Sequence, residues 1–326
     1  MHISFFTSES GYNPAVGYGQ ASMGIITSLQ KLGHLVTPNN AKADLQLNFI
    51  SPIAYKYNRP TQYTIGYTPW ESTLLPHFWK ENMNRCDEVW ATCAFNAWVY
   101  REQGVTRPIK IYKHGLHDVW KNSTKRTVGS KFRFLHIGEP SERKGGSLTV
   151  KTFIETFGNN PDVELTVKCH ETSTIRVYDM FGERVDFSKY PNIKFVSKEM
   201  SDEELVMLMH SHHCLIYPSY GEGFGFIPIQ AMATGMPVIC TEAWAPYKEF
   251  ITLKLQSTLG DSPWPLMLPG KMFHPDVDHL KYLMTEVVYK YDQYVETALS
   301  NLDEMYKQYD WLTLTEKAFA HLKNIA

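Results

Sequence analysis

The sequence predicts an α/β protein built from two Rossmann-like domains that face each other across a cleft. Short apolar segments of strand length alternate with segments of helical periodicity, and this alternation restarts after a polar stretch at 121–131. A chain of 326 residues is also long enough for two domains of ordinary size. Alternating strands and helices favour a parallel sheet with helices on both faces. We expect domains at 1–124 and 128–307, with a C-terminal helix at about 308–326 that packs back onto the first domain.

The first half opens with a predicted strand at 2–8, a glycine-bearing loop at 9–19 and a helix at 20–34. Ala21, Ile25 and Leu29 recur at helical spacing, and the nearby Gly33 is suited to a helix C-terminus. The rest of this half contains a segment of helical periodicity at 78–90 and a series of strands, namely LVTP, DLQLNFI, YTIGYT, EVWAT and KIYKHG.

The second half repeats the pattern, with a strand at 132–138, the loop EPSERKGG, a helix at 147–158 and a strand at 163–168. Ser201 and Glu204 then form a capping-box pattern that opens another helix. A strand, a glycine-rich loop, a helix ending at Gly235 and the strand PVICT come next, and the chain is predicted to be helical from about 280 onward.

Composition places the chain among globular proteins, since 43% of its residues are apolar and 20% are charged. The five cysteines are scattered without metal-ligand spacing, which is typical of reduced, buried thiols. We see no signal-peptide pattern and no apolar run long enough to span a membrane. We therefore expect a cytoplasmic protein, or one of a host cytoplasm if it is viral, that meets membranes at most peripherally. The histidines near 212 suit a helix-to-strand junction better than a metal site.

Charge is unevenly distributed between the two halves. Residues 1–126 carry 13 Lys and Arg against 8 Asp and Glu, whereas residues 127–326 carry 19 against 26. The basic first half suits an anionic partner. Chance surface composition explains the asymmetry equally well, so both interpretations stay open.

The loop YGEGFG at 220–225 is the most informative local feature. Loops after parallel strands are where α/β proteins bind ligands. This one is neither a P-loop nor a GxGxxG turn, and the carboxylate of Glu222 inside it would repel a pyrophosphate. A carboxylate accepts hydrogen bonds well from paired hydroxyl groups, such as those of a sugar. The structural alternative is an ordinary acidic residue at a helix N-terminus.

The segment PSYGEGFGFIPIQAMATGMPVI at 218–239 resembles the signature of retaining glycosyltransferases of family 4. Most of the chain shares the resemblance, including GYGQASMGIITSLQKLGHLV, PWESTLLPHFWKENMNRCDEVWATCAFN, the KHG crossover and HIGEPSERKGGSLTVKTF. It implies a GT-B fold and transfer of a sugar from a nucleotide-diphosphate donor, such as a UDP- or GDP-sugar, with retention of configuration. It implies no cofactor and no protein-bound metal.

The resemblance also assigns site residues by position. Glu222 would hold donor-sugar hydroxyls, and Arg143 and Lys144 would pair with the diphosphate. Gln230 stands where the family has a ribose-binding glutamate, and Glu139 stands where many members have an arginine. If position 230 does not meet the nucleotide, Glu249 is the first other candidate for the ribose contact. The remaining assignments are Gly17, Gly19, Gly223, Phe224 and Gly225 on the donor side and Glu71 on the acceptor side.

Two questions stay open at this level. The departures at Gln230 and Glu139 keep a non-catalytic nucleotide-sugar or glycan binder as an alternative to an enzyme. The acceptor stays open among a lipid-linked glycan, another glycan such as a polysaccharide, a protein and a hydroxylated base in DNA, and the oligomeric state is not determined by the sequence.

Overall fold

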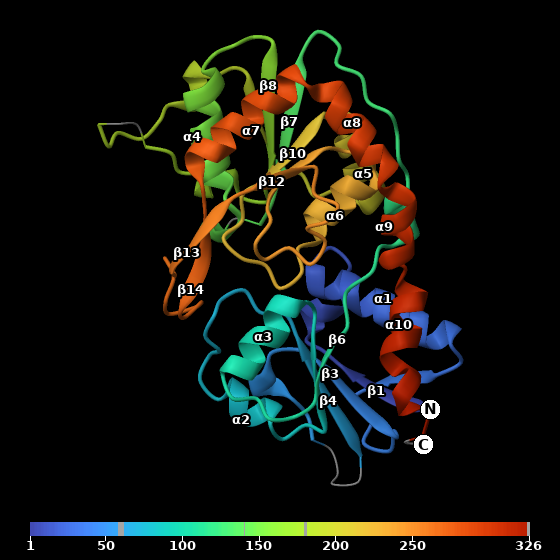
Figure 1. The fold of residues 1–326 in the computed structure, drawn as a ribbon. Helices are drawn as coiled ribbons and strands as arrows, with labels where there is room; N and C mark the ends of the chain where they lie inside the picture. Colours follow the sequence, from blue (N-terminus) through green and yellow to red (C-terminus); the bar gives the residue numbers. More distant parts are fainter. Residues whose placement is uncertain (58–61, 140, 179–180, 325–326) are drawn as a thin grey trace.

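The computed structural model describes residues 1–57, 62–139, 141–178 and 181–324, and it contains two six-stranded parallel sheets (Figure 1). The N-terminal sheet has the order β2-β1-β3-β4-β5-β6. Its strands are β1 His2–Phe6, β2 Leu35–Pro38, β3 Leu45–Phe49, β4 Tyr63–Thr68, β5 Glu88–Ala91 and β6 Ile109–Ile111. This sheet is the lower half of the molecule in Figure 1.

The second sheet has the order β12-β11-β10-β7-β8-β9. Its strands are β7 Phe132–Ile137, β8 Val163–Lys168, β9 Ile193–Val196, β10 Cys214–Tyr217, β11 Val238–Thr241 and β12 Leu253–Leu255. A separate antiparallel hairpin consists of β13 Ser257–Asp261 and β14 Lys271–Pro275. The predicted fold class, two Rossmann-like α/β domains, is therefore confirmed, and the two sheets lie within the predicted limits of 1–124 and 128–307.

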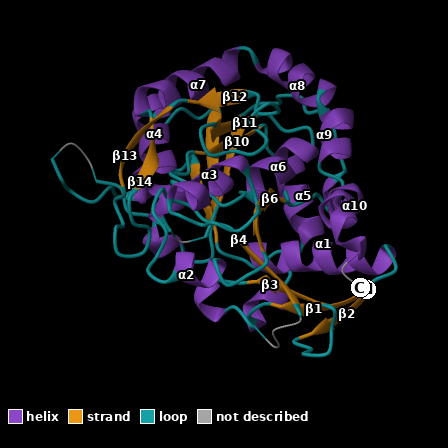
Figure 2. Ribbon diagram, turned by 60° about the horizontal axis from the view of Figure 1, so that its bottom comes forward, coloured by secondary structure: helices purple, strands orange, loops and turns teal. Residues whose placement is uncertain are grey.

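Helices flank the sheets, as Figure 2 shows. They are α1 Gly17–Lys31, α2 Trp79–Met83, α3 Ala94–Glu102, α4 Gly146–Phe157, α5 Asp202–His210, α6 Phe226–Ala233, α7 Val277–Tyr289, α8 Tyr291–Ser300, α9 Leu302–Gln308 and α10 Trp311–Phe319. No helix among the described residues is long and apolar enough to cross a membrane.

The second sheet is buried on both faces because side chains alternate along each strand. In β10, Leu215 and Tyr217 join an apolar cluster with residues of α5 and α6, while Cys214 and Ile216 join a cluster with α4 and α7. All five cysteines of the chain are free and buried, as the sequence predicts.

The last helix, α10, lies against α1 of the N-terminal domain. The ring of Trp311 fills the space beside Gly24 and Gly115, where a Cβ would collide with it. Tyr112 and Thr315 share a buried hydrogen bond of 2.6 Å. The C-terminal segment thus returns from the second domain and packs on the first.

Two local predictions differ from the structure. The first helix begins at Gly17 rather than residue 20, so Gly17 and Gly19 lie in its first turn and not in the preceding loop. The helical periodicity at 78–90 yields only the short α2, whereas the predicted strand EVWAT forms as β5 and pairs with β4. The capping box of Ser201 and Glu204 forms as predicted.

Candidate functional site

The candidate site lies at the carboxyl ends of β7 and β10, where two loops pack against each other. The backbone N–H of Tyr220 donates to the carbonyl of Arg143 at 2.9 Å, and the hydroxyl of Ser219 donates to the same carbonyl at 3.1 Å. Gly145 adopts a φ of +79° and has no room for a Cβ beside Pro218. These contacts place the Arg143–Lys144 segment directly beside the YGEGFG loop.

Glu222 is buried, and its carboxylate lies between the two cations. Oε2 accepts from Nζ of Lys144 at 2.8 Å, and Oε1 lies 3.2 Å from Nη1 of Arg143. Oε1 also accepts from the hydroxyls of Ser219 at 2.8 Å and Tyr217 at 3.1 Å. In this structure the carboxylate therefore holds Arg143 and Lys144, which distinguishes it from an ordinary acidic residue at a helix N-terminus.

Electrostatics keep Glu222 ionised. Burial alone would raise the pKa of this carboxyl group, but Lys144 and Arg143 outweigh burial and lower the pKa to about 2. The carboxylate in turn stabilises the guanidinium: burial lowers the pKa of Arg143, but Glu222, Glu71 and Glu139 raise it above its usual value. The cluster is a permanently charged group at neutral pH.

This shift predicts a pH dependence of stability. A carboxyl group with a folded pKa of about 2 and an ordinary value of 4.5 contributes stabilisation that is complete above pH 4.5 and disappears as the pH falls toward 2. We expect the difference in the free energy of unfolding between wild type and Glu222→Gln to shrink over this range. Urea unfolding of both proteins at a series of pH values measures it, and a difference independent of pH would contradict the assignment.

Glu139 also belongs to the cluster. Its Oε1 lies 3.0 Å from Nη2 of Arg143 and 3.9 Å from Nζ of Lys144. Nη1 of Arg143 donates further to the carbonyl of Gly221 at 2.5 Å. The family resemblance places an arginine at position 139. In this chain Arg143, four residues further on, provides the guanidinium group of the cluster, and Glu139 orients it.

The glycine loop is pressed against the N-terminal domain. A Cβ at Gly221 would collide with the carbonyl of Glu71, and one at Gly223 would collide with Pro69. The hydroxyl of Thr92 donates to the carbonyl of Gly223. Glycine is needed at both positions because backbone meets backbone there. The backbone of Glu71 therefore lies against the loop that carries Glu222, and burial raises the pKa of the Glu71 carboxyl group above its usual value.

The N-terminus of α1 approaches the same region from the first domain. Gly17 faces the ring of Phe226 at the start of α6, and the residue before it, Val16, provides no side-chain cap. Glycine is required at position 19 for a different reason: a Cβ there would collide with the carbonyl of Asn13 in the loop that precedes α1. The backbone N–H groups of this first turn are suited to an anion.

Phe224 differs from the donor-binding assignment. Its side chain is buried in the core and packs against His114, Phe226 and Tyr247, with ring centroids 4.9, 5.2 and 5.8 Å away. The ring contributes packing rather than a surface for a ligand. Gly225, with a φ of +79°, turns the chain into α6.

His114 fixes the crossover between the domains. Its Nδ1 shares a 3.1 Å hydrogen bond with the hydroxyl of Tyr67, and its ring stacks on Phe226 at 5.2 Å. Burial lowers its pKa to about 3, so the ring is neutral at physiological pH. The three histidines near 212 bond to backbone and side-chain groups of neighbouring loops and strands. Among the described residues, no group of three or more His, Cys, Asp or Glu could hold a metal.

Gln230 is buried and bridges the domains. Its Nε2 donates to Oε1 of Gln20 in α1 at 2.7 Å, and Nε2 of Gln20 lies 3.4 Å from a carboxylate oxygen of Asp202. None of the described residues forms a hydrogen bond with Oε1 of Gln230. A buried acceptor without a partner is costly, and a ligand hydroxyl would satisfy it. Gln20, Tyr217 and Ser219 complete this region. Gln20 and Ser219 lie in segments that carry the family resemblance, but the sequence assigned a role to none of the three.

We expect Gln230→Glu to destabilise the fold by about 2 kcal/mol, because its carboxylate would face the oxygen of Gln20. Rotating the Gln20 amide would relieve this contact but would turn its oxygen toward Asp202. Urea unfolding measures the loss, and adding Asp202→Asn should restore part of it, since the asparagine amide can donate to the rotated Gln20. Unchanged stability of the single variant would mean that Gln20 does not constrain position 230.

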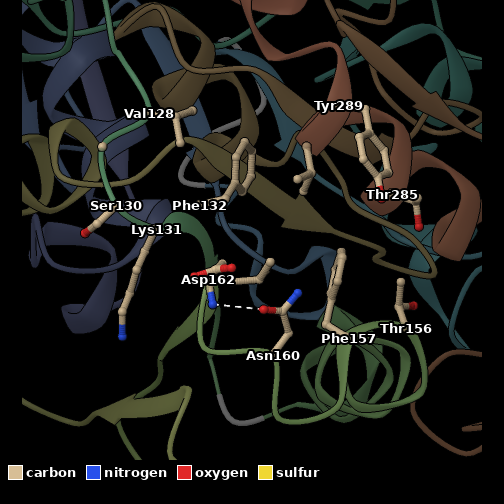
Figure 3. A pocket seen from close by; sticks show the side chains of 13 residues that line it. Val128, Ser130, Lys131, Phe132, Thr156, Phe157, Asn160, Asp162, Thr285 and Tyr289 are labelled. Carbon is tan, nitrogen blue, oxygen red and sulfur yellow. Dashed lines mark hydrogen bonds between the residues drawn. The ribbon is translucent and has the colours of Figure 1, made fainter.

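A hollow of about 530 Å³ lies elsewhere on the second domain (Figure 3). It is lined by Phe132 at the start of β7, by Val163 at the start of β8 and by Tyr289 at the end of α7. Because these residues mark the amino ends of the strands, the hollow is at the opposite end of the sheet from the Glu222 cluster.

Comparison with solved structures confirms the architecture as a GT-B glycosyltransferase fold. A sucrose-phosphate synthase from Thermosynechococcus elongatus has a TM-score of 0.71 with 13% identity, covering 100% of this chain and 99% of the other. An Escherichia coli structure described as trehalose-6-phosphate bound with UDP-2-fluoro glucose has a TM-score of 0.64 with 10% identity, covering 94% and 78%. At these identities the likeness concerns the fold.

Sequence comparison points to the same class. Residues 183–263 match the family described as Glycosyl transferases group 1. The human alpha-1,3/1,6-mannosyltransferase ALG2 is 26% identical over 132 residues, or 36% of this chain and 30% of that protein. The O-antigen chain mannosyltransferase RfbU of Salmonella typhimurium is 41% identical over 58 residues, or 18% and 16%. The chain thus spans less than a third of the length of these two relatives, and the matches together support a glycosyltransferase.

Proposed function

We propose that this protein is a retaining glycosyltransferase of the family 4 type, which moves a sugar from a nucleotide-diphosphate donor to an acceptor hydroxyl. The observation that carries the proposal is the placement of Arg143 and Lys144 on Glu222, at the carboxyl ends of parallel strands and facing the other domain. Group transfer from a nucleotide sugar generates a diphosphate leaving group, and fixed cations stabilise charge that develops there.

The cations are held in place before any donor arrives. Arg143 is fixed by Glu222, Glu139 and the carbonyl of Gly221, so little rotamer freedom is left to lose on binding. Its planar group can pair with two phosphate oxygens, whereas Lys144 provides a compact charge. The first turn of α1 adds backbone N–H groups on the opposite side of the diphosphate.

Glu222 has two tasks in this proposal. Oε1 accepts from Ser219 and Tyr217 and pairs with Arg143, whereas Oε2 accepts from Lys144. A carboxylate oxygen can accept more than one hydrogen bond, so Oε2 can also receive a hydroxyl of the donor sugar. The same residue would then orient both the leaving group and the transferred sugar.

In this proposal the substrates themselves, rather than a side chain of the protein, provide the group that accepts the acceptor's proton. We propose that a phosphate oxygen of the donor takes the proton of the acceptor hydroxyl, which attacks from the face that the diphosphate leaves, so that configuration is retained. Glu71 is placed on the acceptor side, where its carboxylate would orient the incoming hydroxyl. Gln230, through its unpaired Oε1, would accept from a hydroxyl of the ribose.

The relatives suggest which substrates to test first. Two are named as mannosyltransferases, one of them for an O-antigen chain, and a structural neighbour binds a UDP-sugar analogue. We therefore propose a UDP- or GDP-sugar donor, a glycan or lipid-linked glycan acceptor, and no metal or other cofactor. The five buried, free cysteines support a cytoplasmic location.

A non-catalytic nucleotide-sugar binder on the same fold is the second candidate. It is favoured by the hydrogen bond between Gln230 and Gln20, which occupies the amide of the residue assigned to the ribose. Incubation with a panel of UDP- and GDP-sugars, with EDTA present, separates the two. Release of nucleoside diphosphate and a product that keeps the donor's anomeric configuration by NMR support the enzyme, and saturable binding without release supports the binder.

A further inference from the structure

A row of three polar side chains joins the two domains beside the candidate site. It consists of Asp202 in α5, Gln20 in α1 and Gln230 in α6, three helices that meet where the domains face each other (Figure 1). We call these three residues the amide row. Nε2 of Gln20 lies 3.4 Å from a carboxylate oxygen of Asp202, and Nε2 of Gln230 donates to Oε1 of Gln20 at 2.7 Å. The row therefore runs from the second domain to the first and back again.

The direction of the hydrogen bonds in the amide row is set at Asp202. An ionised carboxylate only accepts hydrogen bonds, so the amide nitrogen of Gln20 faces Asp202 and the amide oxygen of Gln20 faces Gln230. Gln230 must then present its own nitrogen to Gln20. The backbone of Gln20 is also held, because Nε2 of His117 donates to its carbonyl at 2.9 Å. The row thus determines which end of the Gln230 amide is left for another partner.

That end is Oε1 of Gln230. The residue is 1% exposed, and none of the described residues forms a hydrogen bond with Oε1. A buried acceptor without a partner is costly, so a ligand hydroxyl that reaches this oxygen is bound favourably. Gln230 therefore offers a single acceptor, since its nitrogen is engaged by Gln20.

We propose that this protein recognises the ribose of its donor through one of the two ribose hydroxyls, and that Gln20 imposes this restriction. The inference rests on the proposed function, in which Gln230 meets the ribose. A carboxylate at position 230 could accept from the 2′ and the 3′ hydroxyl together, whereas Oε1 of Gln230 is one acceptor for one hydroxyl. The donor class therefore extends to nucleoside diphosphate sugars that lack the other hydroxyl.

Gln20 acts as a positioning residue, because it works through Gln230 and belongs to the opposite domain. The restriction exists only while the two domains pack against each other as they do here. Without the Gln20 side chain, the nitrogen of Gln230 could donate to the oxygen of the second hydroxyl. Removing Gln20 should therefore add a requirement for that hydroxyl, which a purely structural role of Gln20 would not do.

Calorimetric titration with deoxy analogues tests the inference without any sugar transfer. UDP, 2′-deoxy-UDP and 3′-deoxy-UDP, and the same three forms of GDP, are titrated into the wild-type protein. For the base that binds, we expect one analogue to bind within about twofold of the parent nucleotide and the other about tenfold more weakly, because the second leaves Oε1 of Gln230 unpaired.

Three variants identify the residues responsible. In Gln20→Leu, the analogue that wild type tolerates should bind about fivefold more weakly than the parent nucleotide. Gln230→Leu removes Oε1 and should bind all three forms within about twofold of one another. The matched control is Gln30→Leu, the same substitution at an exposed position of the same helix, which should keep the wild-type pattern.

Equal weakening by both analogues in wild type would show that both hydroxyls are held, and it would overturn the inference. Equal binding of both analogues and the parent would overturn it as well, since Oε1 would then not face the ribose. An unchanged pattern in a folded Gln20→Leu would refute the role of Gln20. In these cases the parent nucleotide still binds and the proposed function stands, whereas no binding of UDP or GDP to wild type would overturn both. If Gln20→Leu does not fold, the wild-type comparison decides alone.

Discussion

Glu222→Ala is expected to lower transfer by about a thousandfold or more, which corresponds to about 4 kcal/mol of transition-state stabilisation. The substitution removes the group that orients Arg143 and Lys144 and that would hold the donor sugar. It should also destabilise the fold by about 3 kcal/mol, since it leaves Arg143 and Lys144 with only the half-exposed Glu139 as a counter-charge. Donor turnover and urea unfolding measure the two effects separately.

Glu222→Gln is the matched control. Glutamine keeps the volume and can still accept hydrogen bonds from Ser219 and Tyr217, but it lacks the charge that pairs with the cations. We expect it to lose most of the activity and less of the stability than alanine does. Turnover near that of wild type in both variants would show that Glu222 is a structural residue only.

Lys144→Ala is the second change with a large expected effect. It removes a charge from the proposed leaving-group site, so kcat should fall about a hundredfold. Stability should change less than in Glu222→Ala, because Glu222 keeps Arg143, Ser219 and Tyr217 as partners.

Lys144→Arg tests whether charge alone is sufficient at this position. It retains the cation but changes its shape, so partial recovery of kcat is expected. A full rate in Lys144→Ala, measured at saturating donor, would contradict a role of Lys144 at the leaving group.

The general architecture could be predicted from the sequence because it depends on local patterns. Short apolar segments of strand length, helical periodicity and the capping box of Ser201 and Glu204 each identify an element without knowledge of the tertiary structure. The exception is the segment at 78–90, where a helix forms only over Trp79–Met83 before the predicted strand EVWAT begins as β5.

The candidate site was harder to predict, because its contacts join distant segments. The sequence indicates that Glu222, Arg143 and Lys144 matter, but not that the carboxylate holds the cations from a position 78 residues away. Gln20 lies 210 residues from Gln230 and carries no motif. Phe224 stands in the recognised motif, yet its ring belongs to the core.

Isothermal titration of UDP and GDP into the wild-type protein and into Arg143→Ala with Lys144→Ala is the most direct measurement of the central claim. We expect one of the two diphosphates to bind wild type at a single site, and the double variant to lose about a hundredfold in affinity. A control with Lys31→Ala and Arg101→Ala, which removes the same charges from the exposed surface of the first domain, should bind like wild type. Equal affinity in wild type and in the Arg143–Lys144 variant, or no saturable binding of either diphosphate to wild type, would contradict the claim that this cluster receives the diphosphate of a nucleotide sugar.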